Sequence, residues 1–296
     1  MKKFRFKKID AFARGSSTGN PAGCVYLDGA GDITEEEMQT IAAQLKGFVN
    51  EVVYIFPEDG GLFLRYFSAE REVEFCGHGT IAAMYDAVAG DEKLRLKKNL
   101  SIRVGNERLD VVNDIDGSDA VYITAPLPLI KDTIIDAASV SAALEIDASA
   151  ISARQPITIV NAGLNTLIVP VQTLDDCLTI NPCLEDLKIF CQDHGLDIIL
   201  VFSAETSSGE RRYRTRVFAP RYGYLEDPAT GSGNSAFACY LLHVGKWDGE
   251  ALVIEQNGDR SNPNIIRLRT VVKDGIRRVQ FGGGAVVRII GEYILY

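Results

Sequence analysis

One short glycine-rich pattern occurs twice in the sequence, first as Phe75-Cys76-Gly77-His78-Gly79-Thr80-Ile81-Ala82-Ala83 and again as Ala229-Thr230-Gly231-Ser232-Gly233-Asn234-Ser235-Ala236-Phe237-Ala238. An aromatic strand segment precedes each copy, Phe67-Ser68-Ala69 and Phe218-Ala219-Pro220. In both copies a Gly-x-Gly turn opens an apolar helix. The repetition predicts a pseudo-symmetric protein of two similar halves, with one cleft between them into which both helix N-termini point.

The composition is that of a globular protein. The chain has 296 residues, of which 46% are hydrophobic and 24% charged, enough for one large or two medium domains. No segment approaches the roughly 18 to 20 apolar residues that span a bilayer, and the basic start Met1–Phe6 lacks the apolar core of a signal peptide. We therefore expect a cytoplasmic protein without membrane contact.

Charge and cysteine usage exclude several classes of partner. Forty acidic side chains against 31 basic ones give a net charge of −9, which argues against nucleic acid as a partner. The six cysteines include no Cys-x-x-Cys pair and the three histidines have no ligand spacing, so no metal site is predicted. Scattered cysteines fit a reducing compartment, where most are small buried apolar residues.

Hydrophobic spacing predicts short strands throughout and one central apolar helix in each half, about Gly77–Val88 and Gly231–Val244. Thr34-Glu35-Glu36-Glu37 is a capping box that begins another helix. Gly15–Pro21 is predicted to be a loop and Pro57–Gly61 a turn. Because regular βαβ alternation is absent, the pattern favours two α+β domains over a doubly wound sheet.

The stretch Thr124–Ile130 carries two prolines and is the candidate crossing between domains. It divides an N-terminal half, 1–125, with the Cys-Gly-His-Gly turn, from a C-terminal half, 126–296, with the Asp-Pro-Ala-Thr-Gly-Ser turn. The last strand, about 284–296, is a candidate to return to the first domain.

The two glycine turns are candidate anion sites. A Gly-x-Gly turn at a helix start leaves backbone N–H groups unpaired, and with the helix dipole they suit a phosphate or carboxylate. Gly231-Ser232-Gly233 is neither a P-loop nor a dinucleotide fingerprint, so no cofactor is predicted. The alternative is a pair of helix starts whose small residues allow close packing.

Two carboxylates are candidates for acid–base chemistry. Glu51 enters an apolar strand, and a partly buried acid there with a raised pKa could move protons near neutrality. The alternative is a solvated loop residue. Asp227 lies just before the second helix start, where the alternative is a partner for the helix dipole.

Cys76 and His78 frame the first glycine of the first turn. A thiol at a helix N-terminus loses its proton more easily, so Cys76 is a candidate base or nucleophile, and a buried apolar cysteine is the alternative. His78 is a candidate proton donor or ligand for a substrate carboxylate, with a structural histidine as the alternative.

Taken together, these residues resemble the PhzF-like isomerase family of phenazine biosynthesis, which has the diaminopimelate epimerase-like fold. The resemblance spans nearly the whole chain. It is carried by the following stretches: Ile9–Phe12, Gly19–Ala22, Asn50-Glu51, Leu64–Phe67, Glu72–Thr80, Glu226–Ser232 and Gly282–Val286.

The resemblance implies two pseudo-symmetric domains, each a β-barrel-like sheet around a central helix, with the active site between them. It implies a cofactor-independent, metal-free proton shift on a small carboxylic acid such as trans-2,3-dihydro-3-hydroxyanthranilate, usually by a homodimer. Glu51 would be the general acid/base, with His78 and Asp227 as further catalytic residues. The implied substrate-binding residues are Asn20, Cys76, Gly77, Gly79, Thr230, Gly231 and Ser232.

Two departures from the family pattern keep other hypotheses open. Asn234 stands where many members have a second histidine, and Thr230 stands where a two-thiol racemase needs a second cysteine. Since threonine is no base at neutral pH, the first alternative is a single-thiol amino-acid epimerase or racemase that uses Cys76. The second is a non-catalytic metabolite-binding protein on the same scaffold.

Overall fold

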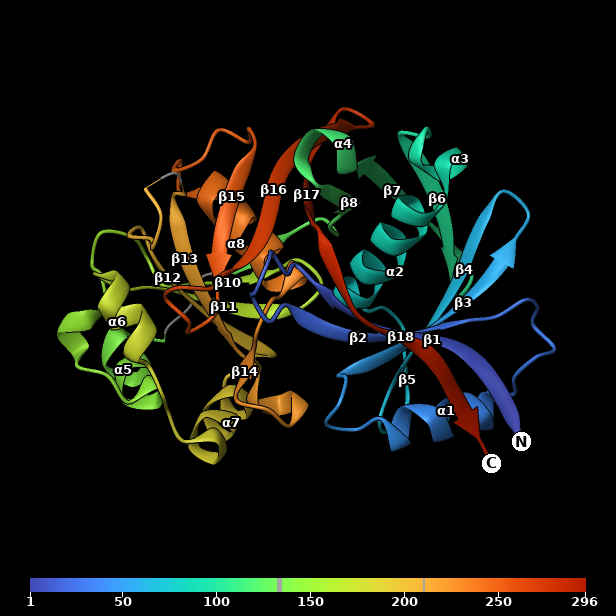
Figure 1. Ribbon diagram of the computed structural model, residues 1–296. Coiled ribbons are helices and arrows are strands. Elements are labelled where there is room, and N and C mark those ends of the chain that lie inside the picture. Colours follow the sequence, from blue (N-terminus) through green and yellow to red (C-terminus); the bar gives the residue numbers. More distant parts are fainter. Residues whose placement is uncertain (132–134, 210) are drawn as a thin grey trace. The chain divides into compact units, whose positions relative to one another are not determined.

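The computed structural model describes residues 1–131, 135–209 and 211–296. The chain forms two compact units (Figure 1). Unit 1 contains Met1–Ile123 and Gly282–Tyr296, and unit 2 contains Thr124–Phe281. Among the described residues, no helix combines the length and the apolar character needed to cross a membrane.

Unit 1 is built from strands that surround one long helix. Its strands are β1 (Lys2–Ala11), β2 (Asn20–Tyr26), β3 (Glu51–Glu58), β4 (Gly61–Ser68), β5 (Glu72–Val73), β6 (Asn99–Val104), β7 (Glu107–Asp114), β8 (Ala120–Thr124, whose last residue belongs to unit 2) and β18 (Ala285–Leu295). Its helices are α1 (Glu35–Gln44), α2 (Gly77–Gly90), α3 (Glu92–Arg95) and α4 (Ile115–Ser118).

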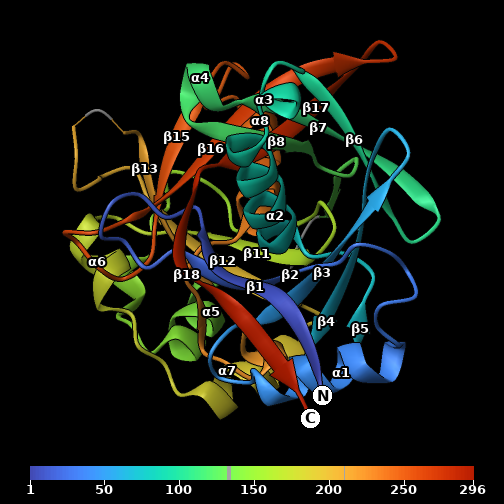
Figure 2. The same cartoon turned by 45° about the vertical axis from the view of Figure 1, so that its right-hand side comes forward.

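The sheet of unit 1 joins the two ends of the chain. β1 is antiparallel to both β18 and β2, β2 runs parallel to β3, and β3 and β4 form a hairpin. Helix α2 is apolar around most of its circumference, as expected of a central helix, and it packs on β1, β2, β3 and β18 (Figure 2). Helix α1 packs on β3 and β4 through Met38, Ile41 and Ala42.

Unit 2 repeats this plan with its own central helix. Its strands are β9 (Leu129–Lys131), β10 (Thr158–Asn161), β11 (Asn165–Pro170), β12 (Ile198–Ser203), β13 (Tyr213–Phe218), β14 (Glu226–Asp227), β15 (Leu252–Gln256), β16 (Asn264–Lys273) and β17 (Ile276–Gly283, whose last two residues belong to unit 1). Its helices are α5 (Ala137–Leu144), α6 (Leu174–Thr179), α7 (Leu184–Asp193), α8 (Gly231–His243) and two 3₁₀ turns, Ala148–Ala150 and Pro220–Tyr222.

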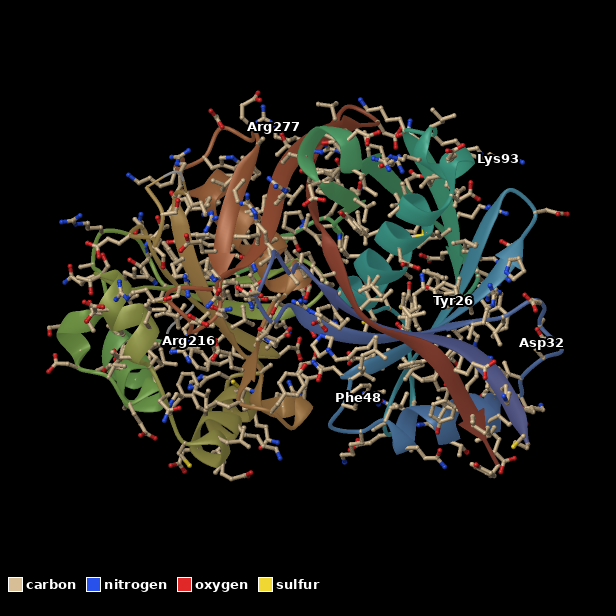
Figure 3. All side chains as sticks on the ribbon, in the orientation of Figure 1. Tyr26, Asp32, Phe48, Lys93, Arg216 and Arg277 are labelled. Carbon is tan, nitrogen blue, oxygen red and sulfur yellow. The ribbon has the colours of Figure 1, made fainter. Side chains whose placement is uncertain are left out.

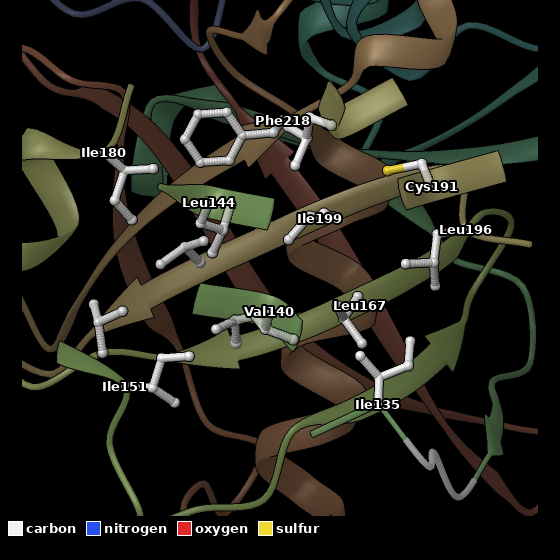
Figure 4. Close-up of a cluster of buried hydrophobic side chains, with 14 of the residues drawn as sticks. Ile135, Val140, Leu144, Ile151, Leu167, Ile180, Cys191, Leu196, Ile199 and Phe218 are labelled. Carbon is white, nitrogen blue, oxygen red and sulfur yellow. The ribbon is translucent and has the colours of Figure 1, made fainter. Parts of the chain in front are cut away.

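Both faces of the central strands of unit 2 are buried. β11 and β12 are parallel, and helix α8 packs against them and against β10 and β16. A second apolar cluster, which includes Leu144, Leu167, Cys191 and Ile199, unites these strands with residues of α5 and α7 (Figure 4). Every residue of β12 is buried, because parallel strands covered on both faces have no solvent side.

The mixed α+β architecture with one central helix per unit agrees with the predicted fold class. The capping box at Thr34 is confirmed, since its hydroxyl accepts a hydrogen bond from the Glu37 amide and the Glu37 carboxylate accepts one from the Thr34 amide. The predicted loop over Gly15–Pro21 is wrong at its end, because β2 already begins at Asn20, where it pairs with Ala11 of β1.

The predicted turn at Pro57–Gly61 is also too long. β3 continues through Pro57 to Glu58, which pairs with Gly61, so the hairpin turn has only the two residues between them. Helices α5 and α6 were not predicted. Each is short and begins at a side-chain cap, from Asp136 and Thr173 respectively, which is a weaker signal in the sequence than a long apolar helix.

Candidate active site

The first glycine turn brings three reactive side chains together in unit 1. Glu51 is the first residue of β3, Cys76 is the N-cap of α2, and His78 lies in the first turn of that helix. Nε2 of His78 is 3.1 Å from Oε2 of Glu51. The Cys76 sulfur lies 3.5 Å from Nδ1 of His78 and 4.0 Å from Oε2 of Glu51. These side chains form what we call the Glu–Cys–His cluster.

Gly79 lets the helix approach β3 closely enough for this contact. A Cβ at Gly79 would lie 2.7 Å from Cγ2 of Val53 and 3.0 Å from Sγ of Cys76. The Gly79 amide donates a hydrogen bond to Sγ of Cys76 (3.3 Å), so the Cys76 side chain caps the helix. Behind the turn, buried Thr80 donates to the Cys76 carbonyl (2.7 Å) and is within 2.6 Å of the Tyr66 hydroxyl.

Asn20 lies beside this cluster on the neighbouring strand. β2 and β3 are parallel with Ala22 opposite Glu51, and Nδ2 of Asn50 donates to Oδ1 of Asn20 (3.0 Å). Asn20 is only 1% exposed. This hydrogen bond ties the start of β2 to the residue before Glu51, and Asn50 was not among the predicted site residues.

The electrostatics of the cluster favour a charged histidine. Burial by itself lowers the pKa of His78, but the adjacent Cys76 and Glu51 more than offset burial and raise that pKa well above its ordinary value. The side chains of His78 and Glu51 are 12% and 20% exposed. These partners therefore favour protonation of His78 beside the Glu51 side chain.

Of the two interpretations of Cys76, the structure favours the buried apolar cysteine over the activated thiol. Burial raises the pKa of the Cys76 thiol, as does the Glu51 carboxylate, and the lowering effects of His78 and the Gly79 amide do not compensate. The helix N-terminus acts only through its nearest amides, whereas loss of solvent penalises the whole thiolate charge. Cys76 is a thiol near neutral pH.

The second glycine turn forms a separate polar cluster in unit 2. Asp227, in β14, is buried and its Oδ2 accepts a hydrogen bond from Oγ1 of Thr230 (2.7 Å). Gly231 begins α8, and a Cβ there would meet the ring of Phe281 at 2.3 Å. Ser232 is half-buried in the first turn of the helix. The predicted residues of this half thus lie within one short turn.

Gln256 holds this second turn together and was not among the residues predicted from the sequence. It is fully buried at the end of β15. Its Oε1 accepts from the Thr230 amide (2.9 Å) and from Nδ2 of Asn234 (2.6 Å), and its Nε2 donates to the Asp227 carbonyl (2.8 Å) and to Oγ1 of Thr230 (3.1 Å). The only signal in the sequence is the polar pair Glu255-Gln256 after an apolar strand.

A buried arginine fixes the strand that carries Asp227. Arg216, labelled in Figure 3, lies on β13, which pairs with β14. Its Nε and Nη2 bind the Glu226 carboxylate at 2.9 and 2.8 Å, and its Nη1 donates to three carbonyls after and within α6, including that of Ile180 at 2.6 Å. Such a bidentate pair restrains Glu226, and with it the adjacent Asp227.

Comparison with known proteins places the chain in a family. The family model described as phenazine biosynthesis-like protein matches residues 9–291. The chain therefore belongs to this family, as predicted.

The curated relatives are named isomerases. An uncharacterized isomerase of Bacillus subtilis is 29% identical over 288 residues, which are 97% of either chain. A trans-2,3-dihydro-3-hydroxyanthranilate isomerase of Pseudomonas fluorescens is 27% identical and is matched over 97% of this chain and 98% of its own. The predicted enzyme class, an isomerase, is thus confirmed.

Solved structures confirm the fold class. The crystal structure of the Bacillus anthracis phenazine biosynthesis protein of the PhzF family superposes with a TM-score of 0.88, at 26% identity and with full coverage of both chains. A hydroxyproline epimerase from Agrobacterium vitis shares the fold at a TM-score of 0.59 and 8% identity, over 98% of this chain and 92% of its own.

Proposed function

We propose that the protein is a cofactor-independent isomerase that moves a proton on a small carboxylic acid resembling trans-2,3-dihydro-3-hydroxyanthranilate. The observation that carries the proposal is the 3.1 Å pairing of the Glu51 carboxylate with the His78 imidazole at a helix start. A carboxylate held beside an imidazole can take a proton from one carbon and return it at another. No metal or cofactor takes part in this proposed step.

Glu51 is the proposed general base and acid. Its carboxylate takes a proton from the substrate, and the resulting carboxylic acid delivers it to the new position. His78, whose raised pKa favours the protonated form, orients the carboxylate and stabilises the negative charge that develops on the substrate. The limited exposure of both side chains strengthens these electrostatic effects.

The remaining predicted residues are proposed to bind the substrate. Gly77 and Gly231 would offer helix-start amides to carboxylate or carbonyl oxygens, and the half-buried Ser232 would add a hydroxyl. Asp227 is proposed as a further catalytic residue whose orientation Thr230 sets through the 2.7 Å hydrogen bond. Asn20, Cys76 and Gly79 would shape the wall around Glu51.

The test is solvent exchange. Candidate carboxylic acids, including trans-2,3-dihydro-3-hydroxyanthranilate, are incubated with the protein in heavy water and deuterium incorporation is followed by mass spectrometry. We expect exchange with wild type and a loss of at least about 100-fold with Glu51→Gln. The matched control is Glu70→Gln, the same change on an exposed loop residue of unit 1. Wild-type exchange rates in Glu51→Gln would reject the assignment.

A single-thiol epimerase is the second candidate, because Sγ of Cys76 lies within 4.0 Å of both partners in the cluster. It requires a thiolate base, which the raised pKa of Cys76 opposes. Cys76→Ser separates the two: loss of all exchange with Cys76→Ser, together with retained exchange in Glu51→Gln, would establish the thiol mechanism. Binding of the acid without any deuterium exchange would instead support the metabolite-binding alternative.

We further propose a homodimer in the cytoplasm. The side chains of Val287, Ile289 and Ile290 on the outer strand β18 are exposed by 38%, 44% and 73%, which is apolar surface that a second copy would cover. All six cysteines are free thiols, as is usual in a reducing compartment. Light scattering of the purified protein tests the dimer, and Ile290→Lys should shift it toward the monomer.

A further inference from the structure

The Glu–Cys–His cluster presents one oxygen, one nitrogen and one sulfur donor to the same point. The donor atoms of Glu51, Cys76 and His78 all lie within 4.8 Å of one another. The edges of the triangle are 3.1 Å from Oε2 to Nε2, 3.8 Å from Sγ to Nε2 and 4.0 Å from Sγ to Oε2. Three different ligand types so close together are more than an acid–base pair requires.

These distances match a tetrahedral zinc site. With Zn–S of about 2.3 Å and Zn–N and Zn–O of about 2.1 Å, the sulfur edges of a tetrahedron are about 3.6 Å and the N–O edge about 3.4 Å. The observed edges differ from these lengths by about 0.4 Å or less. The three donors therefore lie close to the spacing that one tetrahedral ion requires.

The donors are also held in place by the fold. Cys76 and His78 share the first turn of α2, and Glu51 is the first residue of the strand on which the helix packs at Gly79 and Val53. Imidazole and thiol ligands select zinc and similar ions over magnesium or calcium, which prefer all-oxygen sites. Three protein ligands leave a fourth position open, unlike a closed structural site.

We propose that the Glu–Cys–His cluster binds one Zn²⁺ per chain, or Co²⁺ in its place, and that the ion inhibits the proton transfer. On binding, the Cys76 thiol and the His78 imidazolium each release a proton to solvent, and Sγ, Nε2 and the Glu51 carboxylate each donate an electron pair to the metal. The metal thereby binds the proposed base, Glu51, and its partner His78 at the same time, so neither can take part in the proton transfer. The inhibitory part rests on the proposed function, and the binding part does not.

Cobalt titration tests the binding. Purified protein is treated with chelator, dialysed and titrated with Co²⁺, and the thiolate-to-cobalt charge-transfer band is recorded. We expect a band that saturates at one ion per chain and that disappears when Zn²⁺ is added. Cys76→Ser should abolish the band, whereas Cys183→Ser, which removes the exposed thiol at the start of α7, should leave it unchanged.

A second variant protects the test against misfolding of Cys76→Ser. His78→Gln keeps the thiol and should weaken Co²⁺ binding by at least about tenfold, with circular dichroism as the check on folding. The proposal is overturned if wild type gives no band at one equivalent, if Cys183→Ser removes the band, or if folded His78→Gln binds as tightly as wild type.

Inhibition is measured separately by the deuterium exchange assay. Exchange should fall to the background of Glu51→Gln as one equivalent of Zn²⁺ is added and should recover with chelator. Saturated metal binding with undiminished exchange would overturn the inhibitory role alone. Absence of exchange in metal-free wild type would instead reject the proposed function, while the cobalt band still decides the binding.

Discussion

Nε2 of His78 lies 3.1 Å from Oε2 of Glu51, so the first turn of α2 and the first residue of β3 share an ion pair. The two residues are far apart in sequence, and the packing of the helix on the strand at Gly79 brings them together. This pair is both the centre of the proposed reaction and a source of stability that depends on pH.

The stability contributed by His78 should decrease as the pH rises. The pKa of His78 is well above its ordinary value in the folded protein, so the folded state holds the proton more tightly than the unfolded chain. The gain is complete below the unfolded pKa of about 6.5 and disappears as pH rises through the folded pKa. We expect His78→Gln to lower the free energy of unfolding by about 1–3 kcal/mol at pH 6.

Urea unfolding at pH values from 6 to 8.5 measures this effect. The difference in unfolding free energy between wild type and His78→Gln should be larger at the acidic end. The control is His243→Gln, which alters an exposed histidine and should give a small difference at every pH. A His78→Gln difference that grows with rising pH would contradict the charged pair.

Features whose interacting residues are close together in the sequence were predictable, and features that join distant segments were not. The capping box at Thr34 and the helix starts at Gly77 and Gly231 were correctly predicted, because their signals lie within a few residues. The helix dipole is equally local, and from the motif alone both an activated thiol and a buried apolar cysteine stayed open for Cys76. In the structure burial raises the pKa of Cys76, and that burial depends on strands that are distant in sequence.

The contact between Glu51 and His78 is a second feature that the local sequence signals could not predict. The sequence marks both residue types, and the family resemblance marks their roles, but the 3.1 Å distance depends on the packing of α2 on β3 and on the missing side chain at Gly79. Gln256 went unnoticed because a glutamine at a strand end is common, and only its four buried hydrogen bonds to Asp227, Thr230 and Asn234 distinguish it.

Cys76 should react slowly with alkylating agents. It is 6% exposed and burial raises its pKa, whereas Cys183 is exposed. With iodoacetamide at pH 7, we expect Cys183 to be modified at least about tenfold faster than Cys76, as measured by peptide mass spectrometry over time. In guanidinium chloride the two rates should become similar. Faster alkylation of Cys76 in the native protein would indicate a thiolate there.

Gly79→Ala should destabilise the protein through a steric clash. The added Cβ would lie 2.7 Å from Cγ2 of Val53, and relief of such overpacking costs about 1–3 kcal/mol. The measurement is the unfolding midpoint in urea, with Gly29→Ala as the control because a Cβ at Gly29 meets nothing within 4 Å.

Val53→Ala identifies the cause of that loss. It removes the clashing methyl groups, so a double-mutant cycle should give a favourable coupling of at least about 0.5 kcal/mol between Gly79→Ala and Val53→Ala. The exchange activity of Gly79→Ala should also fall, since the helix start that carries His78 moves away from Glu51. Additive effects of the two substitutions would show that the close approach is not the cause.

Gln256→Ala should lower the free energy of unfolding more than the same substitution at Gln172. In the folded protein it removes four hydrogen bonds and leaves the Thr230 amide and Nδ2 of Asn234 without their shared acceptor in a fully buried place. An unsatisfied buried group costs about 1–3 kcal/mol, so the free energy of unfolding should fall by about 2–4 kcal/mol. Gln172→Ala, at an exposed site with one hydrogen bond to the Ser149 carbonyl, is the matched control.

The same variants distinguish a general stabiliser from a positioning residue. If Gln256 holds the turn that presents Asp227 and Thr230, then Gln256→Ala should reduce the maximal exchange rate even at temperatures far below its melting transition, where the protein is fully folded. Gln256→Glu keeps one acceptor for the Thr230 amide and should recover part of the rate. A folded Gln256→Ala with the exchange rate of Gln172→Ala would mean that the network stabilises unit 2 without setting the geometry of the turn.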